Sequence, residues 1–173
     1  MLDERDEFPQ TAQPTPKTLE NLYSRLAGHY DSIIAVHLSQ KLSGTCSASL
    51  KAADRVSRET GTRITVIDSK TLSGALGLLV LRIARLIEAG KTHDEIVAEA
   101  ERILPDAKIL VGVRTLKYMV RGGRVSPMAG AMARLLNLKP IVSMGTTGES
   151  KVFDKAFSQQ GSLRRILHHA REY

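Results

Sequence analysis

The first half of the chain alternates between short apolar runs and stripes of apolar residues at helical spacing. Residues 33–39 form a near-continuous apolar run, which predicts a strand buried on both faces, as in a parallel sheet. Residues 64–67 form a second, β-branched run and predict a second strand. Helix-spaced apolar residues fill the stretches around these runs. This alternation predicts a three-layer α/β/α unit with a mainly parallel sheet.

Polar and small residues mark where the predicted helices begin and end. Thr15 followed by Pro16 is typical of an N-cap and a first helical residue, and Gly28 is expected to end that helix. Thr92 is expected to cap a later helix, with Glu95 completing a capping box. A helix between these two is expected to be well buried. Its apolar residues are Leu76, Leu79, Val80, Ile83, Leu86 and Ile87.

Beyond Pro105 the pattern favours antiparallel strands. Residues 109–113 predict a strand, and residues 116–120 predict a short helical segment. Two further apolar runs, 141–144 and 151–153, flank a Gly-Thr-Thr-Gly turn and predict a β-hairpin. The hairpin indicates a second unit rather than a continuation of the parallel sheet.

Two more helices are expected in this second half. Ser126 and Pro127 are expected to cap one of them, and a closing helix is expected from about Ser162. The apolar residues of the first are Met128, Met132, Leu135 and Leu136. The chain is therefore expected to hold an N-terminal α/β domain over residues 1–105 and a C-terminal α/β domain with an antiparallel hairpin over residues 106–173.

Composition is that of an ordinary globular protein, with 42% hydrophobic and 25% charged residues among 173. Cys46 is the single cysteine, so no internal disulfide can form and a reducing cytoplasm is expected. The first residues are acidic and lack an apolar signal core. The longest apolar stretch, residues 76–83, is too short to span a bilayer and contains Arg82. We expect a soluble cytoplasmic protein that is not exported.

The net charge of +7 is unevenly distributed, because residues 1–107 carry −2 and residues 108–173 carry +9. The second half is therefore expected to face something acidic. Nucleic acid is disfavoured, since neither a base-stacking motif nor a recognition-helix pattern accompanies the charge. An acidic ligand, an acidic protein partner and a merely solvated basic surface stay open as alternatives.

The segment Ser43-Gly44-Thr45 follows the first predicted strand and opens a helix. Free backbone N–H groups, the positive end of the helix dipole and two hydroxyls then point the same way, which favours binding of a carboxylate or phosphate. The simpler interpretation is an N-cap that stabilises its helix by roughly 1 kcal/mol. A nucleophilic serine is disfavoured, because no G-x-S-x-G elbow occurs and His37 lies within the strand.

Two further polar clusters are candidates for ligand binding. Arg121 and Arg124 flank two glycines, which let a ligand approach the backbone while a guanidinium pairs with a carboxylate or phosphate. Thr11 begins the second cluster, residues 11–16, and its hydroxyl can serve the same ligand as that of Ser43. The alternative for the arginine cluster is a basic surface turn, and the alternative for residues 11–16 is an extended linker. No nucleotide P-loop occurs, and the five histidines lack metal-ligand spacing, so no metal is expected.

These clusters, taken in order, are the basis of a resemblance to the DegV family of bacterial fatty-acid-binding proteins. Further matching segments lie at residues 39–45, 66–70, 74–77 and 138–141. Together the segments cover nearly the whole chain, and their order and spacing make the match specific.

The resemblance implies a two-domain protein that holds one long-chain fatty acid between its domains. The carboxylate would be held by Thr11, by Ser43 of the Ser43-Gly44-Thr45 motif and by an arginine, with Arg124 the first choice and Arg121 the second. Such a protein presents the carboxylate to a fatty acid kinase related to dihydroxyacetone kinases, and the acyl phosphate feeds phospholipid synthesis. It would be a carrier and not an enzyme, with no cofactor besides the bound fatty acid. A basic second half would also suit transient contact with an anionic membrane surface.

The chain also departs from the family pattern. Ala12 stands where Ser is usual and Cys46 where Tyr is common. Family chains are longer, with a D-S-T strand motif before Thr11 and a glycine-rich segment beyond Tyr173, so this chain resembles a member truncated at both ends. Two alternatives stay open: an enzyme or binding module for a phosphorylated small molecule at Ser43-Gly44-Thr45, and a partial module that pairs with another chain.

Overall fold

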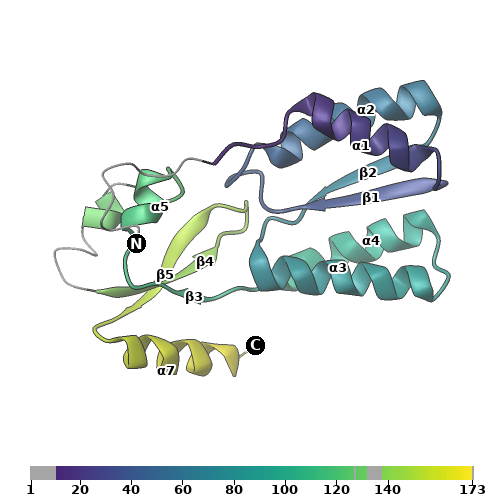
Figure 1. The fold of residues 1–173 in the computed structure, drawn as a ribbon. Coiled ribbons are helices and arrows are strands. Elements are labelled where there is room, and N and C mark those ends of the chain that lie inside the picture. Colours follow the sequence, from purple (N-terminus) through teal and green to yellow (C-terminus); the bar gives the residue numbers. More distant parts are fainter. Residues whose placement is uncertain (1–10, 127, 132–137, 173) are drawn as a thin grey trace.

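Two α/β units lie next to each other in the computed structural model, which describes residues 11–126, 128–131 and 138–172 (Figure 1). The first unit is a parallel sheet between two helical layers, with α1 and α2 on one face and α3 and α4 on the other. The second is an antiparallel sheet with α7 packed against it. The fold class expected from the sequence is confirmed, whereas the division of the chain into domains at residue 105 stays a prediction.

The first unit is built around the pair of strands β1 and β2, which run parallel and in register from Ser32↔Arg63 to His37↔Asp68. Both strands come from the β-branched and apolar runs that predicted them. Its elements are α1 (Pro16–Ala27), β1 (Ser32–His37), α2 (Thr45–Thr60), β2 (Arg63–Asp68), α3 (Ser73–Glu88), α4 (His93–Ile103) and a 3-10 turn, η1 (Leu104–Asp106).

The predicted helix boundaries of this unit are confirmed. Thr15 caps α1 by accepting a hydrogen bond from Thr18 N at 3.2 Å, and Gly28 is the C-cap of the same helix. Thr92 and Glu95 form the capping box of α4, with each side chain accepting from the other's backbone N–H. Local polar chemistry therefore sets these boundaries.

The core of the first unit lies on both faces of the sheet. On one face, α1 and α2 bury Tyr23, Ala52 and Val56 against the strands. On the other, Leu79 of α3 and Ile96 of α4 pack beneath the same strands. The sheet is thus enclosed above and below, as predicted for a three-layer unit.

Burial within this unit is lower than the sequence predicts. β1 is half-buried rather than fully buried, and α3 leaves Val80 46% exposed and Ile87 58% exposed. A physical reason is the width of the sheet, which has two strands among the described residues. Two helices side by side span roughly 20 Å, whereas two strands span roughly 10 Å. The helical layers therefore overhang the β1–β2 pair, and part of each apolar face stays in solvent.

The second unit is an antiparallel sheet of order β3-β4-β5. The predicted hairpin is confirmed, with the turn at residues 145–148. The predicted strand at 109–113 is reduced to two paired residues, because only Val111 and Gly112 are in register with β4. Its elements are β3 (Val111–Gly112), α5 (Lys117–Arg121), β4 (Lys139–Met144), β5 (Ser150–Ala156) and α7 (Gln159–Ala170).

The predicted helices of the second unit are confirmed only in part. The closing helix α7 begins three residues earlier than predicted, because Ser158 is its N-cap and accepts from Gly161 N at 3.0 Å. Ser126 accepts from Ala129 N at 3.3 Å, in keeping with the predicted cap. Met128 lies in a helical stretch and is 75% exposed, whereas Pro127, Met132, Leu135 and Leu136 lie outside the described residues. Among the described residues, no helix combines the length and apolar composition that crossing a membrane requires.

Asp154 joins β5 to α7, and its lowered pKa predicts that the free energy of unfolding depends on pH. Partial burial raises the pKa of this carboxyl, but hydrogen bonds from His169, Lys155 N and Arg165 outweigh that effect and hold it at about 2, below the ordinary 3.8. The stabilisation is therefore complete above about pH 4 and is lost as the pH falls towards 2. We expect Asp154→Asn to flatten the pH dependence of the free energy of unfolding in that window, as measured by urea titration. An unchanged slope would contradict the prediction.

Candidate functional site

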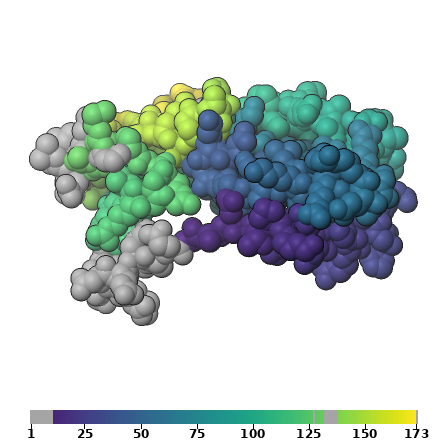
Figure 2. Space-filling view, turned by 90° about the horizontal axis from the view of Figure 1, so that it is seen from above, coloured from purple at the N-terminus to yellow at the C-terminus, as the bar shows by residue number. Residues whose placement is uncertain are grey.

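An apolar cavity of about 370 Å³ lies at the junction of the two units. Its polar rim includes Thr11 from the N-terminal segment and Arg124 from the loop after α5. Figure 2 shows the molecule hollowed between the α5 region and the α1–α2 side. The apolar side chains that line the cavity are Leu42, Leu72, Ile109, Val111, Val113, Tyr118, Met119, Val142 and Met144.

A second hollow, of about 600 Å³, adjoins this cavity and is more polar. Thr11 and Arg124 line both hollows, so the two spaces meet at these residues. Ser43 and Gly44 line the second one, together with Lys41. The arrangement is an apolar chamber with a polar and basic mouth.

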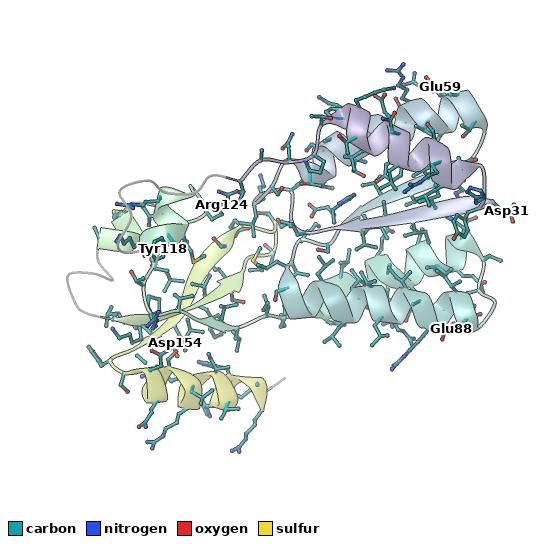
Figure 3. The ribbon with its side chains drawn as sticks, in the orientation of Figure 1. Asp31, Glu59, Glu88, Tyr118, Arg124 and Asp154 are labelled. Atoms are coloured by element: carbon teal, nitrogen blue, oxygen red, sulfur yellow. The ribbon has the colours of Figure 1, made fainter. Side chains whose placement is uncertain are left out.

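Arg124 is placed by a tight turn at the end of α5. Gly122 caps the helix and Gly123 takes a positive φ of 76°, a conformation that side chains disfavour. The chain then folds back so that Arg124 N donates to Met119 O at 2.8 Å. The Arg124 side chain reaches the first unit, where Nε donates to Leu42 O at 3.3 Å. Figure 3 shows Arg124 at the junction of the two units.

Ser43 lies in the turn between β1 and α2. Its Oγ lies 2.9 Å from Thr45 Oγ1 and accepts from Thr45 N at 3.3 Å, so the hydroxyl partly caps α2. Gly44 is the N-cap residue of α2. A Cβ at Gly44 would meet only the end of the Gln13 side chain, so the N-terminal segment passes close to this turn. Both interpretations of this motif, the cap and the ligand site, are compatible with this geometry.

The structure brings together most of the residues that the sequence singled out. Thr11, Ser43 and Arg124 line one continuous hollow, although they are far apart in the sequence. Thr45 is hydrogen-bonded to Ser43 but lines neither hollow. Arg121, the second choice, also lines neither hollow. That these residues hold a ligand stays a prediction.

Sequence reasoning missed the apolar lining of the cavity. The spacing of some lining residues could have indicated a shared apolar face. Val111 and Val113 are two residues apart, and so are Val142 and Met144. Residues two apart in a strand point to the same face. Tyr118 and Met119 carry no such indication, since only the fold places α5 against this face of the sheet.

The Ser–His pair near the site is structural. His37 Nε2 lies 2.7 Å from Ser49 Oγ, and Tyr23 OH lies 2.5 Å from the same oxygen. Ser49 is fully buried, which keeps this hydroxyl from any substrate. Burial lowers the pKa of His37 from its ordinary value, against a smaller opposite effect of Asp68. The network joins α1, β1 and α2 and contributes no nucleophile to the cavity.

Metal chemistry has no support in the described part of the chain, which contains no group of three or more His, Cys, Asp or Glu side chains placed to hold an ion. Hydroxyls and a guanidinium can hold an anionic head group while apolar walls enclose a hydrocarbon tail.

Comparison with known proteins identifies the family of this chain. A family model described as "Uncharacterised protein, DegV family" matches residues 1–173. A DegV domain-containing protein of Deinococcus radiodurans is 33% identical over 166 residues, which are 96% of this chain and 57% of that protein. A fatty-acid-binding DegV family protein from Thermus thermophilus superposes with a TM-score of 0.85 at 32% identity, over 96% of this chain and 57% of that one.

A third similar protein is the Streptococcus pneumoniae Fatty Acid Kinase (Fak) B3 protein, whose structure was solved with linoleic acid. It shares the fold with a TM-score of 0.88 at 24% identity, over 99% of this chain and 60% of that one. The chain therefore spans less than two thirds of the length of each of these relatives.

Proposed function

Because this chain belongs to the DegV family, we propose that it binds one long-chain fatty acid between its two units. The acyl chain occupies the apolar cavity, and the carboxylate lies at the mouth among Thr11, Ser43 and Arg124. The observation that carries this proposal is that an apolar chamber and a polar hollow meet at Thr11 and Arg124. The fatty-acid-binding DegV protein of Thermus thermophilus supports the choice of ligand.

The energetics favour a ligand with one charged end and a long apolar tail. Each buried methylene contributes about 0.8 kcal/mol, so a sixteen-carbon chain gains on the order of 10 kcal/mol before the costs of association. The carboxylate must keep partners, because an unpaired buried charge costs several kcal/mol. A guanidinium and hydroxyls at the mouth meet that need and leave the head group near solvent.

A second part of the proposal concerns what happens to the exposed head group. The chain acts as a carrier in the cytoplasm and presents the carboxylate to a fatty acid kinase. The kinase transfers the γ-phosphoryl group of ATP to a carboxylate oxygen, which yields ADP and an acyl phosphate for phospholipid synthesis. The charge of +9 on residues 108–173 suits docking to an acidic partner surface or, transiently, to an anionic membrane.

Mass spectrometry of the protein purified under native conditions tests the first part. We expect one long-chain fatty acid per chain, released by organic extraction. Refilling of delipidated protein with palmitate should be stoichiometric, whereas inorganic phosphate and glycerol phosphate should not compete. Competition by phosphate esters would instead favour a binding module for phosphorylated small molecules, and well-folded protein that neither retains nor takes up lipid would overturn the proposal.

A further inference from the structure

We propose that Ser39 is a positioning residue that aligns the two halves of the head-group site. This inference rests on the proposed function for its ligand, but it is built from different contacts. Ser43 belongs to the first unit and Arg124 to the second, so their relative position depends on what holds the units together. Ser39 is fully buried, and hydrogen bonds from both units meet at it.

Within the first unit, Ser39 sets the turn that carries Ser43. Its backbone carbonyl accepts from Leu42 N at 3.0 Å and from Ser43 N at 3.2 Å. Its own N–H donates to Thr71 O at 2.9 Å, which ties the turn to the loop after β2. A shift of Ser39 therefore moves Ser43.

Across the junction, the Ser39 side chain holds the β4–β5 turn of the second unit. Ser39 Oγ donates to Gly148 O at 2.5 Å and accepts from Lys41 N at 3.2 Å. The approach is close, since a Cβ at Gly148 would collide with Ser39 Oγ and lie 3.1 Å from Lys70 Cα. Gly148 also has a φ of 89°, so this position requires glycine for both conformation and space.

A further hydrogen bond connects the β4–β5 turn to Arg124. Ser150 follows Gly148 by two residues, and its Oγ donates to Arg124 O. A path of hydrogen bonds and two peptide links therefore runs from Ser43 N through Ser39 and Gly148 to the backbone of Arg124. Ser39 lines neither hollow, so it acts on a ligand only through the residues it positions.

Binding of two ligands that differ only at the head group tests this role. We expect Ser39→Ala to weaken myristate binding about two- to tenfold, the effect of one net hydrogen bond, as measured by equilibrium dialysis. Binding of tetradecanol, which has the same tail and no carboxylate, should stay within about twofold of wild type. Ser47→Ala, an exposed serine on α2, is the matched control and should change neither. Equal losses for both ligands, or no loss for myristate, would overturn the inference.

A ligand-free measurement separates this inference from the proposed function. Spin labels at Lys51→Cys on α2 and Arg164→Cys on α7 report the distance between the units. The native Cys46 is buried, and burial raises the pKa of its thiol, which disfavours its labelling. We expect Ser39→Ala to broaden the distance distribution, and an unchanged distribution would overturn the inference whatever the ligand. Wild-type protein that binds neither ligand would overturn the proposed function alone.

Discussion

Arg124→Ala is expected to weaken fatty-acid binding by about ten- to a hundredfold. A hydrogen bond to a charged group contributes roughly 1.5–3 kcal/mol, and here the lost partner leaves a carboxylate at the edge of an apolar cavity. The measurement is the dissociation constant of palmitate by equilibrium dialysis. The double variant Ser43→Ala with Arg124→Ala should bind more weakly still, because it removes donors from both units at once.

Two variants, one at Arg121 and one at Arg124 itself, serve as controls for this prediction. Arg121→Ala removes the same charge three residues away, from a side chain that lines neither hollow, and should leave binding within about twofold. Arg124→Lys keeps the charge and loses the planar fork, so an intermediate loss is expected. Equal losses for the two alanine variants would show that net charge matters and the position of Arg124 does not.

The largest effect on stability is expected from Leu116→Ala, in the core beneath the cavity. Leu116 is 2% exposed and packs with Val125 and Val142. Its truncation removes buried methyl groups and leaves a void, which costs about 2–5 kcal/mol. We expect a corresponding loss in the free energy of unfolding, measured by urea titration with fluorescence or circular dichroism.

The same substitution at an exposed leucine gives the control. Leu78 of α3 is 69% exposed, so Leu78→Ala should change the free energy of unfolding by less than about 0.5 kcal/mol. A Leu116→Ala variant as stable as the Leu78→Ala variant would contradict the assignment of this core. Because Leu116 immediately precedes α5, its loss should also loosen the loop that carries Arg124.

Features determined by neighbours in the sequence were predictable. The caps at Thr15 and Thr92, the strand over residues 64–67 and the hairpin around residues 145–148 all depend on contacts within a few residues. These elements were assigned correctly from spacing and residue type. Anion binding at Ser43-Gly44-Thr45, which was inferred from a strand that ends where a helix begins, stays a prediction.

Features that depend on distant parts of the chain were not predictable. The exposure of Val80 and Ile87 follows from the number of strands in the sheet, which the periodicity of α3 does not encode. The contact of Ser39 with Gly148 joins positions 109 residues apart, and each is an unremarkable turn residue by itself. The family resemblance placed Arg124 before Arg121, but the physical reason that only Arg124 of the two lines the cavity is the fold of the chain after α5, which local sequence does not encode.

The narrow sheet of the first unit has a consequence for the behaviour of the protein in solution. Each strand of the β1–β2 pair has an edge that no described strand covers, and such an edge is a template for pairing with another polypeptide. The net charge of +7 opposes that association, because like-charged molecules repel one another. Salt screens this repulsion and so weakens the barrier to pairing at these edges. Colloidal stability of this molecule is therefore a property of its ionic surroundings as much as of its fold.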